Sequence, residues 1–482
     1  NNRAIVNKKD GVALNCGSQI NISGGQIGSN SLDAPGTYSG VSVAAGVSDW
    51  SVKDVTFGAA TGYSLTHKHS IVVAAGASDY YSIVGNRMTW TTQTAAPIFD
   101  GALGSHRLVK DNVPGDIVYV PTPKMFGAYC DGSSHPLSGL YGTLAAAQAA
   151  YPSAVALTDE ADWAALQQAV NTSGSDLEFS AGTCKINRQI SAQKTIHWRG
   201  TPPTVSEYSG GVATPSGGTW FHFDHAGIGL YLRDNAAVGT AYKTSRLESI
   251  GTYRTQPAPG VGWAPGAFDY DIANEFVLEL EDVFLFNPTK GVKVRSGGVI
   301  SEARNVRGQP LSIGVYYERS ADTNVWYNLH FWPYWTVDSN VITNTINNAI
   351  GVSVTRADGL KMYSPFSYGY KWLIQATDAV GAGSGFAGFS ITDAYADAGC
   401  GVAEIISDNY AAWGSFSGTT TANAESTPLC TSGPGVHIGG SVASSVDVDN
   451  LHVRRAMDEA LLVNGAAHKV RVKGGRLQSW NI

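Results

Sequence analysis

Short runs of alternating apolar and polar residues, each closed by a glycine or aspartate corner, repeat along most of this chain. The run SGVSVAAGVSDWSVKDVTFG at residues 39–58 returns at residues 69–88 as HSIVVAAGASDYYSIVGNRM, so that Asp49 recurs as Asp79. A strand-and-turn unit with a period of about 20–50 residues cannot bury its apolar face alone, but stacked neighbours can. The pattern therefore predicts an all-β solenoid, a parallel β-helix.

One segment instead carries helical periodicity. Thr158 can cap a helix that runs through DEADWAALQQAVNT, with Trp163, Leu166 and Val170 on one face. Strand-like runs separated by turn residues then follow one another over residues 247–482. We expect one short capping helix ahead of a long body of coils.

The order of these segments is unusual. Residues 125–172 look like the start of a β-helix, with a Gly-Ala-x-x-Asp-Gly turn before the helix, yet residues 1–115 already have the pattern of mid-body coils. Joining the two ends places Gly474-Gly475 and Gly24-Gly25 at equivalent corners, one coil period apart. We predict a circular permutation in which residues 1–115 stack directly after residue 482, with two tandem β-helices as the alternative.

Four parts are thus expected. They are later coils over residues 1–115, a linker over residues 116–124, a β-helix start with its capping helix over residues 125–246, and central coils over residues 247–482.

Composition and charge narrow the possible functions. The 482 residues include 56 Gly, 22 Tyr and 12 Trp against 15% charged residues, a content that suits strands and tight turns. A net charge of −7 without a Lys/Arg-rich run argues against nucleic acid as a partner, and no apolar run approaches the roughly 20 residues that cross a bilayer. The five cysteines lack CxxC spacing, so we expect core thiols, no metal site and no cofactor.

Several segments carry a family resemblance. FGAYCDG, DWAALQQAV and LEFSAGTCKI resemble the N-terminal signature of pectate-lyase-like phage tailspikes, and WYNLHFWPYW, ADGLKMYSPFSYGY and GFAGFSITDAYADAGCGV resemble successive coils of their central body. The resemblance implies a right-handed parallel β-helix, usually a homotrimer on the virion tail. It also implies that the protein binds and cleaves a bacterial capsular or O-antigen polysaccharide during adsorption.

Aromatic residues concentrate in the segment 326–335. Sugars present hydroxyls to polar groups and C–H faces to rings, so such a cluster is a candidate glycan site. Alternation along a strand sends about half of the rings inward, and Phe331 is expected in the core. The candidate substrate-binding residues are Trp326, His330, Trp332, Tyr334 and Trp335.

Candidate catalytic carboxylates follow in the next coils. Asp393 and Asp397 lie close together in ITDAYADAGCG, and Asp358 precedes Asp393 by nearly one coil period. Stacked carboxylates raise one pKa and leave another group ionised, as an endoglycosidic hydrolase requires. Glu318 is the next candidate. Turn capping by these aspartates is the alternative interpretation.

Two other functions stay open. A polysaccharide lyase would remove a proton beside a uronic acid carboxylate, with His330, Tyr334, Arg356 and Lys371 as candidates. A non-catalytic receptor-binding adhesin could use the same fold and the same rings, and exposed rings could also form a subunit interface. Hydrolysis is the predicted activity, with elimination second.

Overall fold

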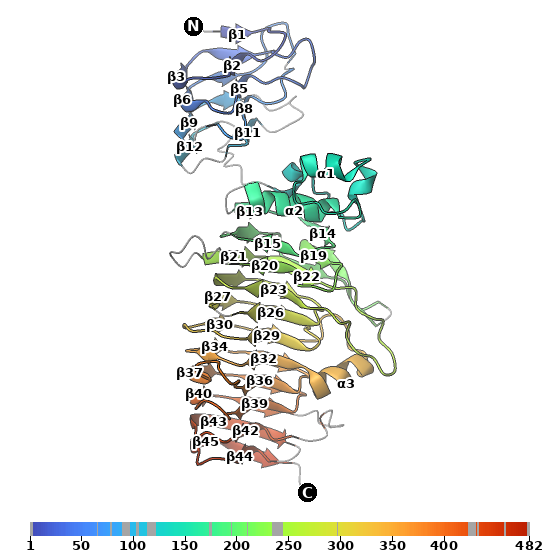
Figure 1. The fold of residues 1–482 in the computed structure, drawn as a ribbon, viewed down its shortest axis with the longest axis vertical. Helices are drawn as coiled ribbons and strands as arrows, with labels where there is room; N and C mark the ends of the chain where they lie inside the picture. The colour runs from blue at the N-terminus through green and yellow to red at the C-terminus, as the bar shows by residue number, and fades with distance from the viewer. Residues whose placement is uncertain are drawn as a thin grey trace. The chain divides into compact units, whose positions relative to one another are not determined.

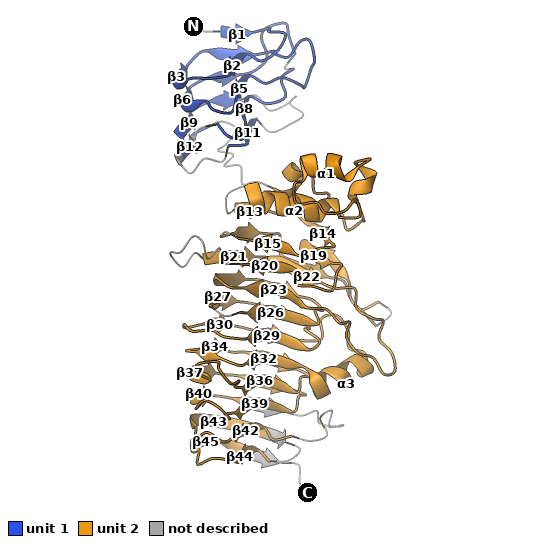
Figure 2. Cartoon of the chain, viewed as in Figure 1, with its two compact units in different colours: residues 1–120 blue, residues 121–482 orange. Residues whose placement is uncertain are grey.

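The computed structural model describes residues 3–479, except for residues 65, 78–79, 89–96, 103–105, 113–121, 173–175, 194, 210, 234–243, 296, 423–429, 431–432 and 457–458. The chain forms two compact units, residues 1–120 and residues 121–482 (Figure 2). Residues 116–121 of the expected linker lie outside the described residues. The expected stacking of residues 1–115 beyond residue 482 stays a prediction.

Unit 1 is a short stack of coils (Figure 1). Each coil contributes one strand to each of three parallel four-stranded sheets. The strands are β1 (Arg3–Ile5), β4 (Gln26–Gly28), β7 (Thr56–Phe57) and β10 (Arg87–Met88) in one sheet, β2 (Val12–Leu14), β5 (Val41–Val43), β8 (Ile71–Val73) and β11 (Ile98–Asp100) in the second, and β3 (Ser18–Ser23), β6 (Ser48–Lys53), β9 (Tyr80–Val84) and β12 (His106–Lys110) in the third. The repeat seen in the sequence is this stack, because Val41 pairs with Ile71 and Trp50 with Tyr81 in parallel register.

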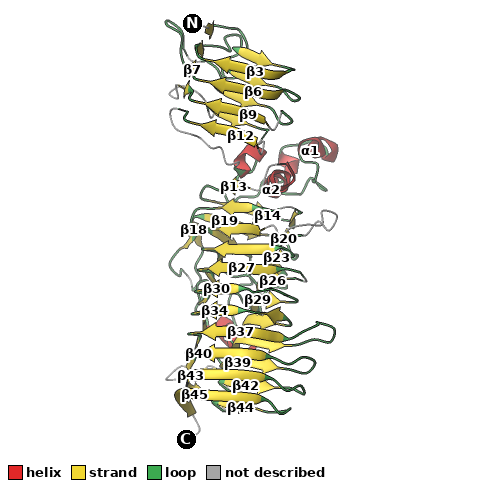
Figure 3. Cartoon of the chain, turned by 90° about the vertical axis from the view of Figure 1, so that its left-hand side faces the viewer, coloured by secondary structure: helices red, strands yellow, loops and turns green. Residues whose placement is uncertain are grey.

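Unit 2 is a longer parallel stack, built on a 21-stranded and a ten-stranded sheet (Figure 3). The first contains β13 (Asp176–Glu178), β14 (Gly182–Ile186), β16 (His197–Arg199), β19 (Thr219–Phe223), β21 (Thr244–Glu248), β22 (Ile250–Tyr253), β24 (Val277–Glu281), β25 (Phe284–Leu285), β27 (Val299–Arg304), β28 (Arg307–Gly308), β30 (Val325–Tyr327), β31 (His330–Phe331), β33 (Ala357–Asp358), β34 (Lys361–Tyr363), β35 (Phe366–Tyr368), β37 (Phe386–Thr392), β38 (Tyr395–Asp397), β40 (Trp413–Ser417), β41 (Thr420–Ala422), β43 (Ser445–Ala456) and β45 (Lys469–Ser479). The second contains β15 (Ile190–Ala192), β20 (Leu230–Leu232), β23 (Tyr270–Asn274), β26 (Lys290–Val294), β29 (Ile313–Tyr317), β32 (Ile350–Val354), β36 (Trp372–Thr377), β39 (Gly401–Ile406), β42 (Val436–Gly439) and β44 (Leu461–Val463), while β17 (Thr204–Val205) and β18 (Pro215–Gly217) form an antiparallel pair.

The predicted β-helix is confirmed by these ladders. Inward side chains of successive coils stack into one continuous core, as at Val292, Val315 and Val352, each of which is at most 1% exposed. The large sheet bends at a column of left-handed corners that fall on Asp282, Asn305 and Asn328 with φ of 52–57°. Asn and Asp tolerate this conformation better than most residues, which explains why they occupy the corners.

The predicted capping helix is present as α2 (Ala161–Thr172). Its buried Asp162 accepts hydrogen bonds from the backbone amides of Tyr129, Cys130 and Lys185. These bonds join the helix to the first coil.

Two further α-helices, α1 (Leu144–Ala150) and α3 (Ser339–Asn348), were not predicted. Asn and Thr fill α3 and are weak helix formers, but Asp338 caps it by accepting from the amides of Asn340 and Val341. Single 3₁₀ turns lie at Pro123–Phe126 and Leu137–Gly139.

The expectation of core thiols is wrong for four cysteines because they form disulfides, and for Cys16 because it is exposed. Cys130 is bonded to Cys184, which ties the turn before the capping helix to β14, and Cys400 is bonded to Cys430. Cys16 is an exposed free thiol. Cysteine spacing contains no sign of these pairs because each joins different coils, 54 and 30 residues apart.

Candidate functional site

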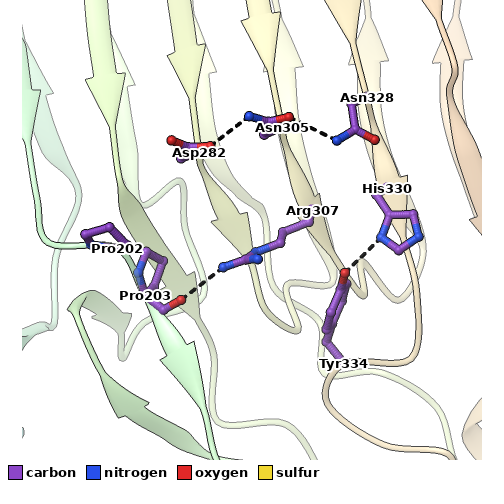
Figure 4. A pocket seen from close by; sticks show the side chains of 8 residues that line it. All are labelled: Pro202, Pro203, Asp282, Asn305, Arg307, Asn328, His330 and Tyr334. Carbon is purple, nitrogen blue, oxygen red and sulfur yellow. Dashed lines mark hydrogen bonds between the residues drawn. The ribbon is translucent and has the colours of Figure 1, made fainter.

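A pocket of about 590 Å³ opens on the outer side of unit 2 where three successive coils present polar and aromatic side chains (Figure 4). The strands β25, β28 and β31 build it, with Phe284 paired to Arg307 and Arg307 paired to His330 in parallel register. Parallel strands are about 4.8 Å apart, so these side chains stack as direct neighbours. The pocket is lined by Pro202, Pro203, Asp282, Asn305, Arg307, Asn328, His330 and Tyr334.

One wall of the pocket is the column of left-handed corners. Asn305 Nδ2 donates to Asp282 Oδ1 at 3.0 Å, and Asn328 Nδ2 donates to Asn305 Oδ1 at 3.0 Å (Figure 4). These bonds fix the amide orientations, and all three side chains are exposed. The column therefore offers a fixed row of acceptors and donors to a ligand.

Arg307 supplies the positive charge of the pocket. Its guanidinium lies over the Phe284 ring at 4.7 Å, and Nη2 donates to the Pro203 carbonyl at 3.1 Å (Figure 4). The ring and the carbonyl hold the side chain in place. Because a guanidinium has five N–H donors, most of them stay available for a carboxylate in the pocket.

His330 and Tyr334 form a hydrogen-bonded pair beside Arg307. The distance from His330 Nδ1 to Tyr334 Oη is 2.8 Å (Figure 4). Burial, helped by the charge of Arg307, lowers the pKa of His330 below its ordinary value, so the imidazole is neutral at pH 7. Burial raises the pKa of Tyr334, so the phenol keeps its proton. The pair thus combines a neutral base with a protonated acid.

An aromatic patch continues from His330 onto the next two coils. The His330 ring lies 4.7 Å from Phe366, which lies 5.4 Å from Tyr395, and Trp332 lies 4.9 Å from Tyr368. Trp332 is 38% exposed. We call these five residues the groove patch, and rings that step from coil to coil in this way can hold consecutive sugar units.

The structure separates the predicted substrate-binding residues into two groups. His330, Trp332 and Tyr334 face outward at the pocket and the groove patch. Trp326 and Trp335 are 1% and 7% exposed, and Trp326 Nε1 donates to the buried Tyr317 hydroxyl at 2.7 Å while Trp335 packs on Trp263. The proposal that these two tryptophans bind sugar is therefore corrected, because they belong to the core. Phe331 is buried as expected.

The predicted carboxylates do not form one patch. Asp358 pairs in register with Ala387, and Tyr368 pairs with Asp397, so the residues of each pair lie one coil apart. Fewer residues separate the members of each pair than separate Asp358 from Asp393, so Asp358 and Asp393 are more than one coil apart in sequence. Asp393 stands at the left-handed corner between β37 and β38, with φ of 53°. Asp358 and Asp397 thus lie on opposite sides of this corner. The expectation that Asp358 and Asp393 stack one coil apart is corrected by this register.

Each carboxylate has its own surroundings. Asp397 pairs in register with Tyr368, a residue of the groove patch, and burial raises the pKa of the Asp397 carboxyl. Asp358 forms an ion pair with Arg356 at 2.7 Å. Glu318 pairs with Lys293 at 2.9 Å on the other large sheet, away from the pocket strands. Lys371 precedes β36 and does not line the pocket.

A signal for the pocket was present in the sequence but was missed. Asp282, Asn305 and Asn328 recur at intervals of 23 residues, each followed by a buried Val or Leu and an outward residue. A shorter coil period in this stretch would have aligned Arg307 with His330. Among the described residues, no group of three or more His, Cys, Asp or Glu side chains has the geometry to hold a metal ion.

Comparisons with known proteins give distant structural neighbours. No protein-family model matches the sequence, and no curated protein matches it. The tailspike protein gp49 of Pseudomonas phage LKA1 is 15% identical, with 73% of this chain and 78% of that chain covered and a TM-score of 0.32. The tailspike gp61 of Pseudomonas phage phi297 is 14% identical, with 72% and 76% covered and a TM-score of 0.26.

A bacterial surface protein is similar to the same degree. PfbA, a surface adhesin of Streptococcus pneumoniae, is 11% identical, with 74% of this chain and 89% of that chain covered and a TM-score of 0.34. The chain thus resembles phage tailspikes and a surface adhesin. Similarity this low carries no argument about activity, so the assignment of a β-helix rests on the parallel ladders of the chain itself.

Proposed function

We propose that this chain binds and cleaves an anionic bacterial surface polysaccharide, a capsule or an O antigen that contains uronic acid. The observation that carries the proposal is the placement of the Arg307 guanidinium next to the His330–Tyr334 pair in one open pocket. The groove patch extends the pocket by two coils, about 10 Å, which is enough for two further sugar units.

The pocket chemistry supports β-elimination. Arg307 pairs with the uronate carboxylate and makes the neighbouring C5 proton more acidic. In the tautomer whose Nδ1–H donates to Tyr334 Oη, the Nε2 lone pair of His330 accepts that proton. The C–H electron pair forms the C4–C5 double bond, the C4–O bond breaks, and the Tyr334 hydroxyl protonates the departing oxygen. No water is consumed.

Hydrolysis is the second candidate, because Asp397 has a raised pKa beside the groove patch. A hydrolase needs two carboxyl groups about 5–10 Å apart. Asp282 is the one carboxylate among the described pocket residues, and its coil is four strand steps, about 19 Å, from the coil of Asp397. Asp393 stands at the corner of the Asp397 coil and does not line the pocket. This separation is why elimination is preferred here over the hydrolysis that the sequence favoured.

The biological setting is proposed together with the activity. A tailspike on the virion tail, assembled as a homotrimer, would bring this pocket to the bacterial surface at adsorption. A non-catalytic adhesin would bind through the same groove patch but would have no use for the neutral His330 and protonated Tyr334. None of the helices in the described residues is long and apolar enough to cross a membrane.

Mass spectrometry of the products tests the proposal. The protein is incubated with a panel of purified capsular and O-antigen polysaccharides, and the products are weighed. Oligosaccharides without an added water, which disappear with His330→Ala, support elimination. Products with an added water support hydrolysis and direct mutagenesis to Asp397. Intact polymer that the protein nevertheless binds supports the adhesin.

A further inference from the structure

A second exposed aromatic platform lies on unit 2, away from the pocket. Trp413 begins β40 and is 56% exposed, although its neighbours Ala412 and Phe416 are buried. It pairs in register with Ala387 of β37, the strand beside β40 in Figure 3. Both strands come before the left-handed corner of their coil, whereas the groove patch strands β35 and β38 come after it.

The indole of Trp413 lies beside a glycine, Gly388, at a β-bulge. The register between β37 and β40 shifts between Ala387 and Phe389, at Gly388, whose φ is 65°. A Cβ on Gly388 would lie 3.1 Å from Cη2 of Trp413 and 3.5 Å from the backbone nitrogen of Gly359. The benzo part of the indole, at Cη2 and Cζ2, therefore lies close to the backbone of Gly388. Bulges of this kind re-aim side chains, and glycine inside a strand permits close approach.

Charged groups lie two strands from Trp413, because Asp358 pairs in register with Ala387 and Ala387 pairs with Trp413. Asp358 precedes Gly359 and accepts from Arg356 Nη2 at 2.7 Å and from Ser384 Oγ at 2.5 Å. The side chains of Arg356 and Asp358 are 25% and 29% exposed, so both reach solvent. A ring face beside an ordered carboxylate and guanidinium matches a sugar, which has apolar C–H faces and hydroxyl edges.

We propose that Trp413, Asp358 and Arg356 form a second glycan-binding site, in which a sugar ring stacks on the indole and its hydroxyls bond to the ion pair. The site rests on the proposed function, because its ligand is a distant segment of the same polysaccharide. The left-handed corner separates it from the groove patch, so only a long chain engages both sites. Two sites on one polymer raise the effective concentration at the pocket.

Binding of polymer and of short products by Trp413→Ala tests this site. The probes are the capsular polysaccharide that the wild type depolymerises and the purified oligosaccharides from that digestion. We expect polymer binding about tenfold weaker, the factor that about 1.4 kcal/mol represents, with binding of the oligosaccharides unchanged. Asp358→Asn, which keeps the packing, should weaken polymer binding in the same direction. Tyr63→Ala, which removes a ring in unit 1 that is 51% exposed, is the matched control.

The outcomes separate this site from the pocket. Unchanged polymer binding by Trp413→Ala, with melting and circular dichroism as in the wild type, overturns the second site alone. A change in the sedimentation coefficient of Trp413→Ala also overturns it, because the indole would then be a subunit contact. A wild type that binds none of the polysaccharides contradicts the proposed function, and the second site with it.

Discussion

Removing the Tyr334 hydroxyl tests the proposed chemistry of the pocket while leaving the shape of the pocket unchanged. In Tyr334→Phe the ring keeps its edge contact with Phe284, 5.0 Å between centroids, but loses the 2.8 Å hydrogen bond to His330 Nδ1. The change removes the proton donor of the proposed elimination and the acceptor of the His330 Nδ1–H, while the ring stays in place. The change is therefore expected to affect rate far more than folding.

The expected loss of stability and the expected loss of rate differ greatly in size. One hydrogen bond in a half-buried site contributes about 0.5–1.5 kcal/mol, so the melting temperature of a unit of this size should fall by no more than about 4 °C. Loss of a general acid lowers kcat by about 10²–10⁴-fold. Binding of the polymer should change little, because Arg307 and the groove patch are intact.

The assay is the ultraviolet absorbance of the new C4–C5 double bond, followed with the polysaccharide that the wild type cleaves. Tyr208→Phe is the matched control, since the Tyr208 hydroxyl donates to the Pro333 carbonyl on the same loop but does not line the pocket. A Tyr334→Phe variant with wild-type kcat would refute the role of Tyr334 as proton donor. Equal losses in both variants would show that the loop, and not the acid, limits the rate.

Three further results are expected. Because the pKa of His330 is lowered, the acid limb of the rate profile should have its midpoint below pH 6.5, and a midpoint at or above 6.5 in kcat/KM would count against His330 as the base. Arg254→Met should cost about 3–5 kcal/mol in chemical denaturation, because it leaves Asp271 buried at 0% exposure without its 2.7 Å partner; a loss under about 1 kcal/mol would contradict this. Replacing Cys130 and Cys184 by Ser reopens a loop closed over 54 residues, which should cost about 4 kcal/mol of unfolding free energy, and calorimetry of the oxidised and reduced wild type provides the comparison.

The repeat in the sequence was sufficient to predict the fold class. Alternation with a period of two, closed by Gly or Asp corners once per coil, leaves each coil with an apolar face that only another coil can cover. The capping helix α2 was also predictable, because its apolar face has a clear helical period. Helix α3 was not predictable in this way, because its Asn and Thr residues form a helix only with the Asp338 cap and the packing of Val341 and Ile346.

Only the tertiary structure decided which residues meet. Coil length varies along unit 2, and the coil from Arg307 to His330 is shorter than the coil from Tyr368 to Asp397, because loops of different size are inserted between the strands. A fixed period therefore placed Asp358 beside Asp393, while the register placed Arg307 beside His330. Alternation likewise indicated that half of the rings face inward, but the phase of each strand sent Trp326 into the core and Trp332 to the surface. Hydrogen-bonded register, which depends on contacts between coils, determined the pocket.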